Sequence, residues 1–128
     1  MNTTYERLGE EAGIRALVDR FYELMDTLPE ATTIRAMHAS DLSSSREKLA
    51  LFLIGWSGGP PAYVSRYGHP RLRARHLPFA VDDAAVAAWV RCMGLALEER
   101  ARDGHLEPAF AQGLFDSFVR IAAHMRNQ

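Results

Sequence analysis

The sequence holds one cysteine, Cys92, and one lysine, Lys48, among its 128 residues. A single cysteine excludes an intrachain disulfide and gives no support to a zinc site built from several thiolates. The formal net charge is −1, so composition gives no reason to expect nucleic-acid binding. No apolar run reaches membrane-span length, and the first residues lack a signal-peptide pattern. We therefore expect a cytoplasmic protein with neither a nucleic-acid nor a membrane partner.

Strand patterns are also nearly absent. Only residues 62–65 have some extended character, and this stretch is too short to found a sheet. Helical periodicity, with apolar residues at i, i+3, i+4 and i+7, instead runs through four segments, at about residues 14–25, 49–56, 86–97 and 110–125. The chain is 48% hydrophobic and has the length of one common domain. We predict an all-α fold, in one domain over residues 1–128, with four substantial helices and several short ones.

Local signals mark the ends of these helices. A possible capping box, Ser44 to Glu47, starts the second long helix, and the run GGPP at 58–61 stops it. Asp82 or Asp83 can cap the third, and Pro108 suits the first turn of the last. Between the second and third helices, residues 62–77 are predicted to be mostly loop. Long loops in compact domains tend to be functional, so this stretch is a candidate site.

The segment GHPRLRARHLPF, residues 68–79, combines an unusual set of side chains. Pro70 and Pro78 bound a short, stiff helical piece that has His76 near its end. Leu77 and Phe79 are expected to pack beside the imidazole, and three arginines lie close by. A rigid neutral imidazole against an apolar wall suits a metal, and arginines suit carboxylates, so the set matches haem. The same spacing also fits a capped turn with solvated arginines, and it leaves both interpretations open.

Other polar side chains fall on the predicted helices. Tyr22 shares a stripe with predicted core residues and would need a hydrogen-bond partner if buried, although a place at the rim is equally compatible. Trp89 raises the same question for its indole N–H, against simple core packing. Ser45 lies near a helix start, where a capping or surface role is the default. No Ser-His-Asp arrangement and no phosphate-binding glycine loop can be assembled from the sequence.

Several short motifs, taken in order, resemble the group II truncated haemoglobins. The resemblance covers nearly the whole length, and the His76 segment together with Trp89 is characteristic of that class. One departure stands at the first corner, where the usual Gly-Gly is Gly9-Glu10, with Gly13 nearby as a possible substitute. The motifs that carry the resemblance are Tyr5-Glu6-x-Leu8-Gly9, Phe21-Tyr22, Gly58-Gly59-Pro60, Gly68-His69-Pro70-x-Leu72-Arg73-x-Arg75-His76-x-Pro78-Phe79 and Ala88-Trp89-x-x-Cys92-Met93.

The resemblance implies a two-over-two helical sandwich around haem b, with a role for each of several residues. His76 would be the proximal ligand of a pentacoordinate iron. Tyr22 and Trp89 would donate hydrogen bonds to a bound ligand, and His38 would line the same distal pocket. Ser45 would stand at the gate of that pocket. The haem itself would contact six further residues: Leu49, Phe52, Tyr63, Arg73, Arg75 and Phe79, with Arg75 pairing with a propionate.

Haem binding by itself leaves the activity open. The resemblance implies binding of O₂, NO, CO or similar ligands, for oxygen storage, transport or sensing. The alternative is a redox enzyme, a NO dioxygenase or a peroxidase-like protein, which would need an external reductase because the chain has no flavin or nicotinamide domain. A helical interaction module without haem is a third possibility. We expect a monomer or a homodimer.

Overall fold

The computed structural model describes residues 2–128, and every regular element in that part of the chain is helical. The prediction of an all-α fold with four substantial helices is therefore confirmed. The helices are α1 (Thr4–Arg7), α2 (Glu10–Thr27), the 3₁₀ helix η1 (Pro29–Ala31), α3 (Thr32–Ala36), α4 (Ser43–Trp56), α5 (Ala62–Tyr67), α6 (Leu72–His76), α7 (Asp83–Arg102) and α8 (Pro108–Met125).

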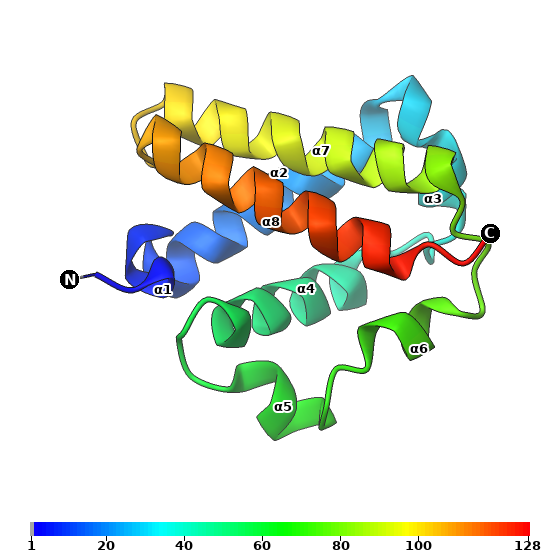
Figure 1. Cartoon of the computed structure of the whole chain (residues 1–128), viewed down its shortest axis with the longest axis horizontal. Helices are drawn as coiled ribbons and strands as arrows, with labels where there is room; N and C mark the ends of the chain where they lie inside the picture. The colour runs from blue at the N-terminus through cyan, green and yellow to red at the C-terminus, as the bar shows by residue number, and fades with distance from the viewer. Residues whose placement is uncertain (1) are drawn as a thin grey trace.

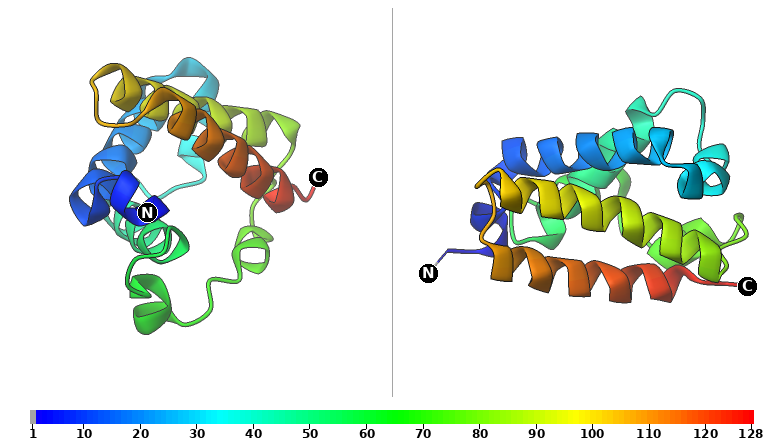
Figure 2. Two further views of the ribbon diagram at one scale, coloured as in Figure 1. Left: turned by 60° about the vertical axis from the view of Figure 1, so that its left-hand side comes forward. Right: turned by 90° about the horizontal axis from the view of Figure 1, so that it is seen from above.

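The four long helices form two pairs, and the short helices α5 and α6 lie below them in the view of Figure 1. Helices α7 and α8 lie side by side, α2 packs on both α4 and α7, and α5 returns against α4 (Figure 1). From α4 the chain descends through α5 and α6 in an arc before it climbs to α7 (Figure 2). The arc brings the segment predicted to carry chemistry beneath the last turns of α8.

The core lies where the apolar stripes of the long helices meet. Each stripe buries one large side chain about every helical turn, as the spacing predicts. Removing a side chain of this size from water stabilises the fold by about 1.5–3 kcal/mol. The largest fully buried side chains are those of Leu8, Ile14, Leu17, Val18, Phe21, Met25, Leu53, Cys92, Met93, Leu97 and Phe118.

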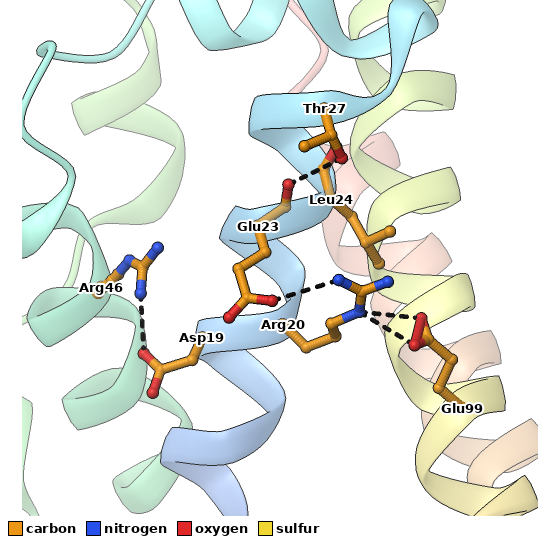
Figure 3. Close-up of polar contacts among 7 residues, drawn as sticks. All are labelled: Asp19, Arg20, Glu23, Leu24, Thr27, Arg46 and Glu99. Carbon is orange, nitrogen blue, oxygen red and sulfur yellow. Dashed lines mark hydrogen bonds and ion pairs between the residues drawn. The ribbon is translucent and has the colours of Figure 1, made fainter.

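Ion pairs on the surface of α2 connect it to the helices on either side. Arg20 donates from Nε to Glu99 of α7 at 3.0 Å, and Arg46 of α4 reaches Asp19 at 3.4 Å (Figure 3). These side chains are all partly exposed. Exposed pairs contribute little stability, typically below about 1 kcal/mol each. They therefore favour one register of neighbouring helices and do not replace the apolar core.

The turn between α1 and α2 shows how the chain accommodates Gly9-Glu10 in place of the Gly-Gly that the resemblance implies. Gly9 and Glu10 both have left-handed backbone conformations, with φ of 96° and 60°. Glu10 adopts this conformation at some cost in strain, because its Cβ crowds the backbone there. Gly13 lies so close to Leu8 that a Cβ would overlap the Leu8 carbonyl oxygen. Gly13 thus keeps α1 and α2 in close contact where the second glycine is missing.

Two sequence-based boundaries need correction. Helix α4 begins at Ser43, and its N-cap, Leu42, makes no side-chain hydrogen bond. The prediction of a capping box at 44–47 is therefore wrong. A real capping box lies at α1, between Thr3 and Glu6, where each side chain bonds the other's backbone N–H. Residues 62–67 are helical and not loop, because prolines are compatible with a helix start and packing on α4 stabilises the turn. The cap at Asp82 is confirmed by its bond to the Ala85 N–H at 2.8 Å.

Candidate functional site

His76 is the last residue of α6, near the end of a short helical piece as predicted. Its Nδ1 lies 2.6 Å from the carbonyl oxygen of Leu72, one turn earlier in the same helix. A carbonyl oxygen can only accept, so Nδ1 carries a proton, and in the neutral imidazole Nε2 is then the nitrogen with the free lone pair. Within residues 2–128 no hydrogen bond reaches Nε2. This arrangement fixes both the tautomer and the ring orientation that a metal-binding histidine needs.

Tyr22 points from α2 toward the start of α4. Its side chain is only 5% exposed, which contradicts a place at the rim, and its hydroxyl lies 3.4 Å from the Ser45 carbonyl oxygen. That distance is long for a hydroxyl bond, so the O–H is held only weakly. Burial raises the pKa of Tyr22 well above its ordinary value, with a small opposing effect of Arg46. The hydroxyl therefore stays protonated and available as a donor.

Aromatic contacts connect His38 to Tyr22 directly and Trp89 to Tyr22 through Phe21. The His38 ring lies 5.9 Å from that of Tyr22, edge to face, and its Nδ1 bonds the Ile34 carbonyl oxygen at 2.8 Å. Phe21 touches both Tyr22 and Trp89, at centroid distances of 4.9 and 5.2 Å. The half-buried indole of Trp89 also packs in the core, and within residues 2–128 its N–H makes no hydrogen bond. The three predicted distal residues thus gather in one cluster.

Helix α4 presents one face to this region. Ser45, Leu49 and Phe52 follow one another at spacings of four and three residues, and all three are half-buried. Phe52 meets the buried ring of Tyr63, on α5, at 6.4 Å. The face therefore runs from the Tyr22 hydroxyl toward the arc that carries His76.

The arginines near His76 divide between two environments. Arg75 bonds the Pro70 carbonyl oxygen through Nε at 2.6 Å, and its guanidinium lies 5.8 Å from the centre of the Tyr63 ring. Arg73, in contrast, donates from Nη1 to the carbonyl oxygens of His124 and Arg126, both at 2.8 Å. The Arg73 guanidinium is thus tied through Nη1 to the end of α8, and its role at a haem edge, which the resemblance implies, stays a prediction.

The apolar neighbours of His76 are not packed as expected. Leu77 and Phe79 are 58% and 41% exposed, so they do not form a buried wall beside the imidazole. The turn that follows α6 is closed by the Phe79 N–H, which bonds the His76 carbonyl oxygen at 3.0 Å. The apolar surface nearest α6 is instead supplied by other elements, as the adjacent cavity shows.

An open cavity of about 680 Å³ lies between α4, residues 69–74 and the second half of α8. Its apolar lining comes from Phe52, Leu72, Ile121 and Met125. Its basic lining comes from His69, Arg71, Arg73, Arg120 and His124, and no Asp or Glu of the described residues takes part. An apolar floor with a basic rim suits a planar apolar group that carries carboxylates at its edge.

Comparison with known proteins decides the family. The model of the bacterial-like globins matches residues 3–127. The chain belongs to this globin family. It is 38% identical to the group 2 truncated hemoglobin YjbI of Bacillus subtilis, over 99% of this chain and 90% of that protein.

Solved structures of related globins share its fold. A cold-adapted truncated hemoglobin of the Antarctic bacterium Pseudoalteromonas haloplanktis superposes with a TM-score of 0.93 at 40% identity, over 99% of each chain. The group II 2-on-2 hemoglobin of Agrobacterium tumefaciens gives 0.91 at 43% identity, over 100% of this chain and 96% of that one. The resemblance to group II truncated haemoglobins and the two-over-two fold are therefore confirmed.

Membership of this family implies that the globin binds haem and, through it, small diatomic ligands. The residues fit such a group: His76, with an unbonded Nε2, lies two residues beyond the stretch 69–74 that lines the apolar cavity with its basic rim, although His76 itself is not among the lining residues. Within residues 2–128 no helix combines the length and apolar character needed to cross a bilayer. Sequence reasoning missed the Leu72 carbonyl as the partner of His76, although a spacing of four residues in a helix was a usable signal.

Proposed function

We propose that this globin binds haem b with His76 as its proximal ligand and holds a diatomic gas on the opposite side. The observation that carries the proposal is the bond between His76 Nδ1 and the Leu72 carbonyl oxygen. It leaves Nε2 as the free nitrogen and gives it greater basicity, which favours coordination to iron. Such second partners are a general feature of metal-binding histidines.

The distal cluster would act on the gas once it is bound. Haem iron supplies the reversible binding site for O₂, CO or NO. Tyr22 offers a hydroxyl that stays protonated, and Trp89 offers an unpaired indole N–H. Donors that are preorganised in a largely apolar environment interact more strongly than they would in water. His38, edge-on to Tyr22, would keep the phenol ring in place or add a third donor.

The haem edge would be held by Arg75 and Tyr63. The guanidinium of Arg75 is exposed and lies near the Tyr63 ring, where a propionate would meet both. Leu49 and Phe52 on α4 would cover the distal face of the ring, and Phe79 would cover its proximal side. Arg73 bonds the end of α8 through Nη1, and its role at the haem edge stays a prediction. We further propose one domain in the cytoplasm, as a monomer or a homodimer.

The test is the visible spectrum of the purified protein with and without the proximal ligand. The wild type should show a Soret band, and His76→Gly should lose most of its haem or regain a wild-type-like spectrum only with added imidazole. His105→Ala is the matched control, because His105 lies in the exposed turn after α7. A His76→Gly spectrum identical to wild type without imidazole would show that another residue is the ligand.

The redox alternative is favoured by one observation. His38 places an imidazole beside the Tyr22 ring, and a distal base of this kind assists peroxide chemistry. A NO dioxygenase or peroxidase-like role would further require an external reductase or an added electron donor. Turnover of NO or of peroxide, measured with a reductant, decides between the two roles. Gas binding with no turnover above that of free haem assigns the protein to ligand storage or sensing.

A further inference from the structure

The helix that carries His76 is short and shallow. Helix α6 has five residues, none of them buried, and it starts after Arg71, whose φ of 47° is left-handed. Helices of this length are not stable in water by themselves. Within α6 only Leu72 packs against the apolar core, and it is only half-buried, so this one side chain does little to fix the position or direction of His76. Contacts with the rest of the chain must do so.

Asn127, just beyond α8, supplies such a contact. Its side-chain Nδ2 donates to the carbonyl oxygens of His76 at 3.2 Å and Phe79 at 2.9 Å. Its Oδ1 accepts from the Val81 N–H at 2.9 Å, and its own N–H donates to the Val81 carbonyl oxygen at 2.8 Å. Both amide hydrogens and the amide oxygen are thus used. The carboxamide spans the turn from His76 to Val81.

Arg73 makes a second contact between α6 and the end of α8, and here the donor belongs to α6. Its guanidinium leaves α6 and bonds the last carbonyl oxygens of the α8 region, at His124 and Arg126. Carbonyl groups at a helix end lack intrahelical partners, and a cation interacts favourably with them. Asn127 and Arg73 therefore clamp α6 between them, one by its carbonyl end and the other by its side chain. We call these two residues the α8 clamp.

We propose that Asn127 is a positioning residue for the proximal histidine. It holds the main chain at His76, while the Leu72 carbonyl oxygen orients the ring. Nε2 would then keep one position and one direction toward the haem. This inference rests on the proposed function, in which His76 binds the iron. The carboxamide is required because two carbonyl oxygens and one N–H must be met by one small side chain.

Two substitutions test the role in the haem-loaded protein. Asn127→Asp keeps the shape but loses both donors and places an anion against two carbonyl oxygens. Asn127→Ala removes the bonds without adding charge. Gln128→Ala is the matched control, because Gln128 is the next residue and only its backbone N–H bonds Val81. The readouts are the iron–histidine stretching band in the resonance Raman spectrum and the rate of haem transfer to an excess of apomyoglobin.

We expect haem loss to be about tenfold faster in Asn127→Asp, as for other changes to groups that support a metal ligand. The stretching band should shift or broaden in both Asn127 variants and stay in place in Gln128→Ala. A clamp that served overall stability alone would lower the melting temperature and leave the band unmoved. Wild-type band position and haem loss within twofold of wild type, in both Asn127 variants, would overturn the proposal.

The proposed function and this inference fail in different ways. If the wild type takes up no haem, or uses another ligand, the proposed function falls and the stretching band gives no information about Asn127. Amide hydrogen exchange of the protein without haem then tests whether Asn127 holds the turn after α6. Asn127→Ala should speed exchange at the Val81 and Phe79 amides, but not at Cys92 in the core. Unchanged exchange at Val81 and Phe79 would refute the clamp itself.

Discussion

The hydroxyl of Tyr22 lies 3.4 Å from the backbone carbonyl oxygen of Ser45. This contact joins the proposed distal donor to the start of α4, the helix that we propose as one wall of the pocket. It is long enough for a bound ligand to compete for the hydroxyl proton. A substitution at Ser45 is therefore expected to affect the Tyr22 hydroxyl, and a substitution at Tyr22 is expected to affect ligand entry beside Ser45.

Removal of either distal donor should speed oxygen release. Tyr22→Phe and Trp89→Phe each delete one hydrogen bond to the bound gas, which is worth about 1 kcal/mol or a rate change of about fivefold to tenfold. Stopped-flow mixing of the oxygen complex with a scavenger measures the rate. Tyr5→Phe, on α1, is the control and should release oxygen at the wild-type rate. Unaltered rates in both distal variants would contradict the assigned donors.

A larger side chain at Ser45 should slow ligand entry. Ser45 is half-buried on the first turn of α4, so Ser45→Leu would place bulk beside the Tyr22 hydroxyl. We expect CO association after flash photolysis to slow several-fold. Ser44→Leu provides the control, since Ser44 is the exposed neighbour on the same turn. Equal association rates in the two variants would mean that the gas enters elsewhere.

Cys92 should not react while the protein is folded. The thiol has no exposed surface, and burial, with a smaller effect of Glu30, raises its pKa to about 11. The reactive thiolate is therefore scarce at neutral pH. A colourimetric thiol reagent should give no signal in native buffer and one equivalent after denaturation. Rapid labelling of the native protein would show that α7 opens often enough to expose its core face.

Glu47 should contribute a small, pH-dependent stability. Its bond from Arg15 lowers its pKa, so the contribution is present above the ordinary carboxyl pKa and is lost as pH falls through the lowered value. Both side chains are over one-third exposed, so solvent screening limits Glu47→Gln to about 0.5 kcal/mol at pH 7. Urea unfolding measured at successively lower pH should show this cost shrinking. Glu98→Gln, on the exposed face of α7, is the control for the loss of a surface carboxylate.

Much of the fold follows from the sequence because the signals are local. The spacing of residues such as Phe21 and Phe118 predicts the buried stripes, and Asp82 and Pro108 begin their helices as expected. Short helices were harder to predict. Helix α5 is stabilised by packing on α4, and propensity within six residues carries no information about that contact.

The candidate site was predictable in part for the same reason. His76 stands in a distinctive segment, and the family pattern points to Tyr22 and Trp89. The role of Asn127 was hidden, because its partners are about fifty positions earlier in the chain and a lone asparagine has no motif. The bonds of Arg73 to the end of α8 were also hidden, since only the three-dimensional fold brings α6 beneath the last turns of α8.

Buried side chains are concentrated in the long helices and are sparse in the arc formed by α5 and α6. The long helices carry the core, whereas α5 and α6 together bury only Tyr63. Segments with few buried contacts open at a free-energy cost below that of global unfolding. We expect α5 and α6 to open locally while α2, α7 and α8 stay folded. Haem would then be exchanged without global unfolding. Amide protons of residues 62–76 should then exchange by local opening, with little dependence on denaturant, while those of α7 require global unfolding.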